Sequence, residues 1–233
     1  MKNATSVWAI AVVLSLSTSP VLGWIDFHDG QIHDIDYQTI DHIRVDYLTP
    51  GMQTTVNLLD GGRIISDLFA YENSYINILG GAIDWDLYAW DNSHVNFSGG
   101  SIGLYLFAED SSHIDISGGS IGHSLSSSGN SQVDISGGSI GDSVLALFDQ
   151  SKIQIFGCDF SIDGIAVGYG ELTSIFGGSY NDEPMRHLTG TLASGELINS
   201  VFYIGHDAKI TLVPEPATLL LLGLATVMVR KRR

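Results

Sequence analysis

Cysteine is almost absent from this chain, proline is sparse and positive charge is scarce. The single cysteine, Cys158, excludes an intrachain disulfide framework. Basic residues number 10 against 26 acidic ones, and half of the basic residues are Lys2 and the run 230–233. Segment 24–213 therefore has a net charge near −20, with five basic and 25 acidic residues. Such a charge repels nucleic acid and anionic membrane surfaces, so we expect no nucleic-acid partner.

Glycine, in contrast, is abundant, and pairs of glycines mark a 19-residue repeat. An alternating apolar and polar run precedes each pair, and such alternation is typical of a strand. An isoleucine and then another short apolar run follow the pair. Three short strands per coil of 19 or 20 residues predict an all-β, single-stranded parallel β-helix, because a strand with a crossover helix needs about 30 residues. The pairs are Gly80-Gly81, Gly99-Gly100, Gly118-Gly119 and Gly137-Gly138.

The repeat can be followed over about seven coils between 56 and 180, the last two of them irregular. Stacking of the coils should place equivalent residues in columns. One column is an interior row of aliphatic residues. Another is acidic and lies at a corner, where aspartate tolerates left-handed backbone geometry. The interior row is Ile76, Val95, Ile114 and Val133, and the corner column is Glu72, Asp91, Asp110, Gly129 and Asp149.

The segments on either side of the repeats are expected to cover the two ends of the rod. An open solenoid exposes unpaired strand edges, which need protection. We therefore interpret 24–51 as an amino-terminal cap, 52–184 as the β-helix repeats and 185–212 as carboxy-terminal cap strands. Within the last segment, 197–204 and 209–212 are expected to pair as a hairpin.

The amino terminus, 1–23, has the features of a secretory signal peptide. Lys2 precedes an apolar run over 7–16, and the small residue Gly23 follows. We expect signal peptidase to cut between Gly23 and Trp24. A retained membrane anchor is the alternative, although the apolar run is shorter than the about 20 residues that span a bilayer.

The carboxy-terminal segment, 213–233, combines three features in order. Pro214, Glu215 and Pro216 form a short motif, 217–229 is an apolar candidate transmembrane helix, and 230–233 is basic. This tail resembles the PEP-CTERM sorting signal of Gram-negative bacteria that make exopolysaccharide. The resemblance implies recognition by an exosortase, a membrane cysteine protease that cuts near the motif. It also implies passage through the inner membrane to the cell envelope, the surface or the extracellular matrix.

Two groups of outward side chains are candidate binding sites, and no cofactor is predicted. Asp115 and Asp134 should lie one coil apart, at about 5 Å, next to His113. A divalent ion there would relieve their repulsion, although exposed carboxylates are normally only solvated. Aromatic residues of the early coils could stack on sugar rings, although a covering loop or cap explains them equally well. These are Trp85, Tyr88, Trp90 and Phe107.

Together these features favour a non-enzymatic surface or extracellular-matrix protein, an acidic rod associated with exopolysaccharide. A carbohydrate-binding adhesin is the first alternative. A polysaccharide lyase or hydrolase is the second, and a lyase needs a strong base in an electropositive groove. The coils between 56 and 180 contain only Arg63 and Lys152 as cations. Near-identical coils also lack the departures from the repeat that a unique catalytic site requires, so no enzyme is expected.

Overall fold

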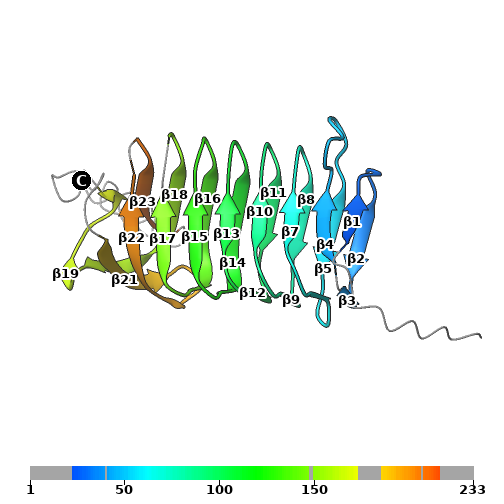
Figure 1. Cartoon of the computed structure of the whole chain (residues 1–233). Coiled ribbons are helices and arrows are strands. Elements are labelled where there is room, and N and C mark those ends of the chain that lie inside the picture. Colours follow the sequence, from blue (N-terminus) through cyan, green and yellow to red (C-terminus); the bar gives the residue numbers. More distant parts are fainter. Residues whose placement is uncertain (1–22, 40, 147–148, 173–184, 206, 216–233) are drawn as a thin grey trace, which may run out of the picture.

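The computed structural model describes residues 23–39, 41–146, 149–172, 185–205 and 207–215. Within these ranges the chain forms a rod of short strands that lie side by side along one axis, with β1 and β2 at one end and β21 to β23 at the other (Figure 1). Successive coils pair through parallel strands in three columns. The prediction of an all-β parallel solenoid of about seven coils is confirmed. The seven coils run from β1 to β18, so they begin at Trp24, upstream of the expected start at 56.

Each column contains one strand, or part of a strand, from successive coils. The first contains β1 (Trp24–Phe27), β4 (His42–Val45), β7 (Leu68–Ala70), β10 (Leu87–Ala89), β13 (Leu106–Ala108), β15 (Ser124–Ser127) and β17 (Ser143–Ala146). The second contains β2 (Ile32–Ile35), β5 (Thr55–Leu58), β8 (Tyr75–Ile78), β11 (His94–Phe97) and the first parts of β14 (His113–Ile121), β16 (Gln132–Ile140) and β18 (Lys152–Ile162). The third contains β3 (Gln38–Thr39), β6 (Arg63–Ile64), β9 (Ala82–Ile83), β12 (Ser101–Ile102) and the last parts of β14 and β16.

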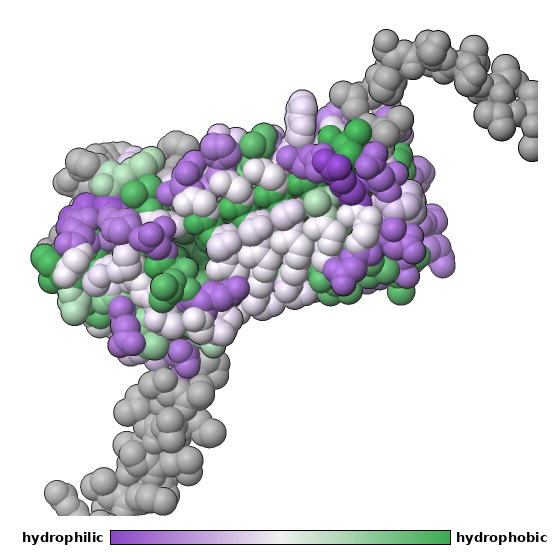
Figure 2. Space-filling model, turned by 90° about the horizontal axis from the view of Figure 1, so that it is seen from below, coloured by the Kyte–Doolittle hydropathy of each residue, from purple (hydrophilic) through white to green (hydrophobic). Residues whose placement is uncertain are grey.

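The core is a set of interior rows along the rod. Ile76, Val95, Ile114 and Val133 are direct partners in successive coils and are at most 1% exposed. The predicted interior row is therefore confirmed. It forms because a period of 19 or 20 residues returns the same face of each strand to the centre, where burial of aliphatic groups drives folding. Figure 2 shows the outside of one face, where a broad band of near-neutral hydropathy occupies the middle of the rod.

The corner column also has the backbone geometry that the sequence predicted. Each of its five members has a positive φ, between 54° and 67°, although four of them are not glycine. The corner carboxylates also bind the backbone of the preceding corner, because Asp91 accepts a hydrogen bond from the backbone N of Glu72. Turn formation therefore accounts for this acidic column.

A buried serine follows each of these corners and yields a stability prediction. The hydroxyl of Ser93 is buried without a hydrogen-bond partner among the described residues, whereas Ser131 donates to the carbonyls of Ala108 and Ser128. We expect Ser93→Ala to leave the free energy of unfolding within about 0.5 kcal/mol or to raise it, and Ser131→Ala to lower it by about 1 kcal/mol. Urea unfolding of both variants measures the difference. Equal losses would contradict the assignment of an unpaired hydroxyl to Ser93.

The segment expected to be a separate cap, 24–51, supplies β1 to β4 and stacks in register with the coils that follow. Two of its residues depart from the interior rows. His33 occupies the position of Val56, and Thr39 occupies that of Ile64. The His33 ring stacks on Phe27, with centroids 4.2 Å apart, and its Nε2 lies 2.9 Å from Asp29 Oδ1. This end of the rod is therefore a coil with a partly polar interior, which suits a core that meets solvent.

The predicted hairpin of 197–204 with 209–212 is wrong. β22 (Leu197–Ile204) pairs in parallel with β17, and β23 (Lys209–Pro214) pairs in parallel with β18. The connection 205–208 has four residues, as does the corner 109–112 between β13 and β14. β22 and β23 therefore lie in two different columns of one coil, because each strand pairs with a strand of the coil below. β22 and β23 thus add a further rung.

Antiparallel strands complete this end of the rod. β21 (Arg186–Leu192) pairs with β22 and with the end of β18, and β20 (Gly170–Glu171) pairs with β23. β19 (Ile165–Ala166) forms a short hairpin with β18. These strands cover edges that would otherwise present unpaired backbone groups. The coil predicted around Ile175, the signal peptide and the apolar run 217–229 lie outside the described residues. Among the described residues, no helix has the length and apolar character needed to cross a bilayer.

Candidate functional site

Aromatic side chains of the first column form a continuous ladder on the outside of the early coils. Phe69, Tyr88 and Phe107 occupy equivalent positions in successive coils. The Phe69 and Tyr88 rings stack with centroids 4.9 Å apart and planes 5° apart, and the Tyr88 and Phe107 rings with 4.7 Å and 9°. Both faces of the Tyr88 ring are therefore covered by its neighbours. Each such contact stabilises the rod by about 0.5–1.5 kcal/mol, and a sugar ring cannot lie flat on Tyr88.

The other two aromatic candidates lie in different surroundings. Trp90 packs against Tyr71 of the preceding coil, with ring centroids 4.8 Å apart, so it extends the ladder sideways. Trp85 lies in the turn between β9 and β10 and is 50% exposed. Among the described residues it has no stacking partner. Of the four candidates, the structure brings Tyr88, Trp90 and Phe107 together and leaves the ring of Trp85 open to solvent.

The ladder has a consequence at alkaline pH. Burial raises the pKa of Tyr71 and of Tyr88 from 10.0 to about 12. The folded chain then holds these phenolic protons at a pH where the unfolded chain releases them, so stability falls between pH 10 and pH 12. We expect an ultraviolet absorbance titration to show a late-titrating phenol fraction that shrinks in Tyr88→Phe. Titration of all tyrosines near pH 10 would contradict this.

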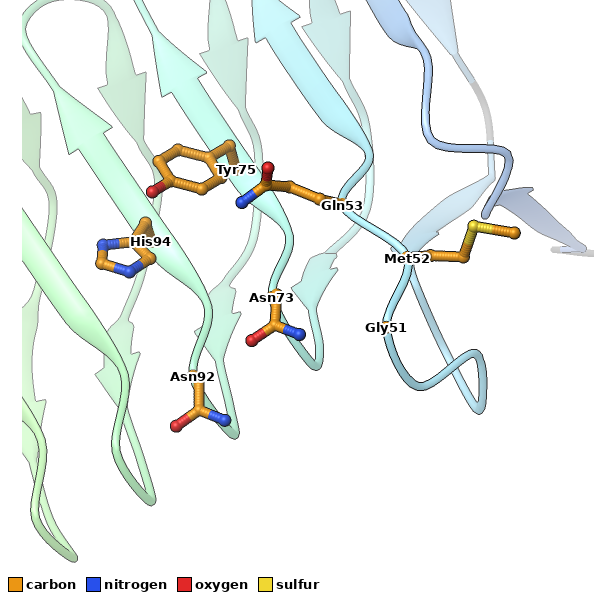
Figure 3. Close-up of a pocket in the computed structure, with 7 residues that line it drawn as sticks. All are labelled: Gly51, Met52, Gln53, Asn73, Tyr75, Asn92 and His94. Atoms are coloured by element: carbon orange, nitrogen blue, oxygen red, sulfur yellow. The ribbon is translucent and has the colours of Figure 1, made fainter.

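A polar cavity lies on the second column, beside the loop between β4 and β5. Its volume is about 300 Å³. Figure 3 shows the Gln53 amide pointing toward Tyr75, with Asn73 and Asn92 at successive corners below. Tyr75 stacks on His94, with centroids 4.8 Å apart and planes 9° apart. The cavity is lined by Gly51, Met52, Gln53, Asn73, Tyr75, Asn92 and His94.

The chemistry of this cavity suits a neutral, hydroxyl-rich ligand. Burial and the neighbouring His113 lower the pKa of His94, which favours the neutral ring, and a neutral imidazole can both donate and accept a hydrogen bond. Side-chain amides also offer both functions. The combination of amides, a neutral imidazole and an aromatic ring carries no net charge. It therefore differs from the acidic surface of the rest of the rod.

A buried carboxylate fixes one wall of the cavity. Asp46 is fully buried with a φ of 56°, and it accepts hydrogen bonds from the backbone N and from Oγ1 of Thr54, at 2.7 and 2.6 Å. This contact closes the loop 46–54 into a defined shape. Sequence reasoning missed the cavity because the loop interrupts the repeat. The only signal in the sequence was that Tyr75 and His94, and likewise Asn73 and Asn92, are one repeat apart. This spacing indicates that they are neighbours, but it does not indicate that the loop closes one side of a cavity over them.

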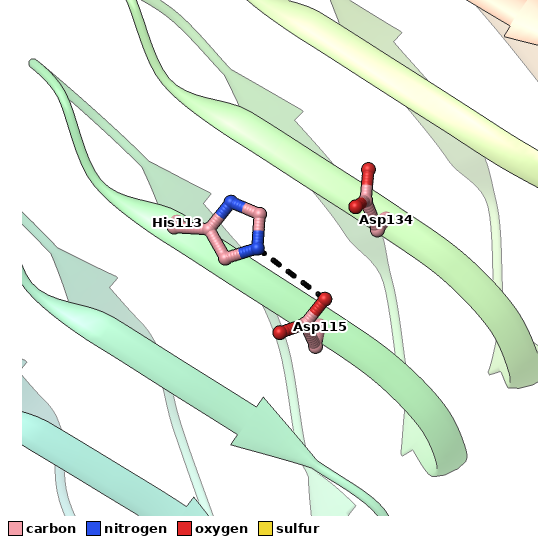
Figure 4. A group of neighbouring side chains, drawn as sticks. All are labelled: His113, Asp115 and Asp134. Atoms are coloured by element: carbon pink, nitrogen blue, oxygen red, sulfur yellow. Dashed lines mark ion pairs between the residues drawn. The ribbon is translucent and has the colours of Figure 1, made fainter.

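The candidate cation ligands come together as predicted from stacking. His113 and Asp115 lie on β14, and Asp134 lies on the adjacent strand β16 (Figure 4). His113 Nε2 is 3.4 Å from Asp115 Oδ1, and one ligand atom from each of the three residues lies within 4.8 Å of the others. Burial raises the pKa of the Asp134 carboxyl, and repulsion from Asp115 acts in the same direction. The group offers one nitrogen and two carboxylates to a cation.

The sorting and cleavage residues lie at opposite ends of the rod. Gly23 immediately precedes β1, and its backbone N donates to Asp41 Oδ1 at 2.7 Å. Trp24 begins β1 and is 49% exposed. Pro214 is the last residue of β23, where it pairs with Gly157, and Glu215 follows it. Pro216 lies outside the described residues, so the motif begins where the last strand of the rod ends.

Comparison with known protein families identifies the tail. Residues 212–233 match the model of the PEP-CTERM protein-sorting motif. Neither a curated protein nor a solved structure matches the chain. The motif implies processing by an exosortase and export to the envelope or surface of a Gram-negative bacterium. The chain is thus an exported protein with a β-solenoid body and a carboxy-terminal PEP-CTERM protein-sorting motif.

Proposed function

We propose that the protein is a non-enzymatic component of the cell surface or extracellular matrix, where its acidic rod associates with exopolysaccharide. The observation that carries this proposal is the junction between rod and tail. β23 pairs with β18 as far as Pro214, the first residue of the sorting motif. Cleavage near the motif would therefore deliver the whole solenoid intact. The amino-terminal signal peptide, signal peptidase and the transmembrane helix of the tail remain part of the proposed route.

The side chains on the outside of the coils support a scaffold role. Many of them bind one another along the rod, as the aromatic ladder does, and so contribute to stability. Arg63, one of the two cations between 56 and 180, donates from Nε and from an Nη to the carboxylate of Asp84, at 2.9 and 2.8 Å. A guanidinium held in this way stays protonated, which does not suit the base of a lyase.

A carbohydrate-binding adhesin is the second candidate, and the polar cavity favours it. Amide groups that both donate and accept can match sugar hydroxyls, and Tyr75 adds an aromatic surface. Such a site also explains how a rod of net charge near −20 could bind a polysaccharide, since the contact is neutral. In this proposal the cavity, and not the stacked ladder, makes the sugar contact.

Co-sedimentation of the purified full-length protein with exopolysaccharide from its own host tests the proposal. We expect the wild type to sediment with the polymer and Tyr75→Ala to bind at least about tenfold more weakly. Tyr169→Ala, which removes an exposed ring at the far end of the rod, serves as the matched control. If Trp85→Ala weakened binding to the polymer and Tyr75→Ala did not, the sugar contact would lie at the Trp85 ring and not in the cavity. No association with the polymer, or shortening of the polymer, would contradict the proposed function.

A further inference from the structure

A ladder of side-chain amides runs along the second column and has a direction. Asn57 donates from Nδ2 to Asp34 Oδ1 at 2.7 Å, Asn77 donates to Asn57 Oδ1 at 2.8 Å, and Asn96 donates to Asn77 Oδ1 at 2.8 Å. The carboxylate of Asp34 only accepts hydrogen bonds, so it obliges Asn57 to present its NH₂ group. Each amide then orients the next, and every oxygen faces the following coil.

The ladder ends against two carboxylates. The next residues in the column are Asp115, the direct partner of Asn96, and then Asp134. The NH₂ group of Asn96 donates to Asn77 Oδ1, so the amide oxygen of Asn96 faces Asp115 on the other side. The Asp115 carboxylate is itself only an acceptor. Asn96, Asp115 and Asp134 therefore present oxygen atoms to one another along the column. The donor printed for Asp134 comes from its own strand, because Gln132 Nε2 lies 3.3 Å from each of its carboxylate oxygens. Two ionised carboxylates on neighbouring rungs repel each other, and a cation or a proton between them relieves that repulsion.

The neighbouring column supplies a nitrogen at the same place. His113 lies beside Asp115 on the same face of β14, with the geometry given above. A cavity of about 290 Å³ adjoins the two carboxylates. Its walls are Asp115, Ile116, Asp134, Ser136, Phe156 and Ala193. The cavity provides space for water or a ligand oxygen next to a bound ion.

We propose that His113, Asp115 and Asp134 bind one divalent transition-metal ion of the Zn²⁺ class, with the amide oxygen of Asn96 as the adjoining donor. An imidazole with two carboxylates suits Zn²⁺, whereas Ca²⁺ prefers six to eight oxygens. The negative charge of the rod raises the local concentration of any cation. Three protein ligands leave at least one coordination position for water or for a group from outside.

Other histidines of the rod provide an internal comparison. His123 Nδ1 lies 2.6 Å from Asp142 Oδ2. The His123 side chain is 48% exposed, whereas that of His113 is 30% exposed. That pair is not part of the group of three, so it offers one nitrogen and one carboxylate. His123→Ala is therefore a matched control that removes an imidazole from an acidic surface without touching the proposed site.

Isothermal titration of the purified full-length chain with Zn²⁺ tests the site. We expect one ion per chain, with affinity at least about tenfold lower in His113→Ala and Asp134→Asn and unchanged in His123→Ala. Circular dichroism of each variant verifies the fold. An adventitious ion only, shown by equal affinities in all variants, or no binding to the wild type, would overturn the proposal.

Asp115→Asn gives a second readout that is independent of metal affinity. An asparagine at this position can donate to Asn96 and continue the amide ladder by one rung. We expect this variant to lose Zn²⁺ binding and yet to unfold at a higher temperature than the metal-free wild type. Zn²⁺ should raise the unfolding temperature of the wild type but not of the variant. A variant that binds Zn²⁺ as the wild type does, or whose metal-free unfolding temperature does not rise, would contradict the argument.

Discussion

Gly100→Ala is expected to destabilise the rod by about 3–5 kcal/mol, the largest effect of any single substitution considered for this protein. Gly100 lies in the middle of the rod with a φ of +79°. An added Cβ would lie 2.5 Å from the carbonyl oxygens of both Gly80 and Gly81, which belong to the preceding coil. The alanine would be strained by its own backbone, and it would push apart two coils that are held together by hydrogen bonds.

Two other glycines separate these causes. Gly164 has a φ of +80°, and a Cβ there meets nothing within 4 Å, so Gly164→Ala should cost only the backbone strain, about 1–2 kcal/mol. Gly168 has open space and no positive φ, and Gly168→Ala should stay within about 0.5 kcal/mol of the wild type. Urea unfolding gives the three values. If Gly100→Ala cost no more than Gly164→Ala, close approach of the coils would not be the reason for the repeated glycines.

Replacing both prolines of the sorting motif, Pro214→Ala with Pro216→Ala, is expected to abolish processing of the tail in the native host. The motif implies processing by an exosortase, and alanine lacks the restriction to extended geometry that proline places on its own and the preceding residue. In the wild type, mass spectrometry should find the mature carboxy terminus near the motif. In the double variant it should find intact Arg233 in the membrane fraction.

The matched control is Pro50→Ala, which removes an exposed proline from the loop between β4 and β5. It should be processed as the wild type is. Pro214 is the last residue of β23, so we expect its replacement to leave the pairing of β23 with β18 in place, and a change in processing then reflects the motif and not loss of the rod. Recovery of intact Arg233 from the inner membrane in the wild type would refute sorting by cleavage.

Within the repeats, most of the structure could be predicted because each coil is the template of the next. The spacing placed Ile76 over Val95, and it placed Asp115 beside Asp134 with His113 next to them. It also placed Tyr88 against Phe107. What it did not reveal was how those two rings face each other. A column specifies which residues are neighbours. The orientation of the Tyr88 and Phe107 ring planes depends instead on side-chain rotamers and on the packing of Phe69 and Trp90 around Tyr88.

Outside the repeats, prediction from local pattern was less successful. The hairpin expected for 197–204 and 209–212 assumed that strands near in sequence pair with each other. β22 and β23 instead pair with β17 and β18, about 58 residues earlier in the chain. The polar cavity depends on the loop 46–54, whose path is set by the contact of Asp46 with Thr54. Nothing in the period of the repeat reports on either contact.

The amino-acid sequence by itself determined the stacked, parallel architecture, the interior rows, the left-handed corners and the sorting tail. These features follow from residue spacing and from short motifs, so they are encoded locally and repeated. Only the tertiary structure decided where the rod begins, how its last rung is added, which ring faces are covered and where a neutral cavity lies on an acidic surface. Those features depend on contacts between residues distant in the chain, and a repeat carries no information about the places where it is interrupted.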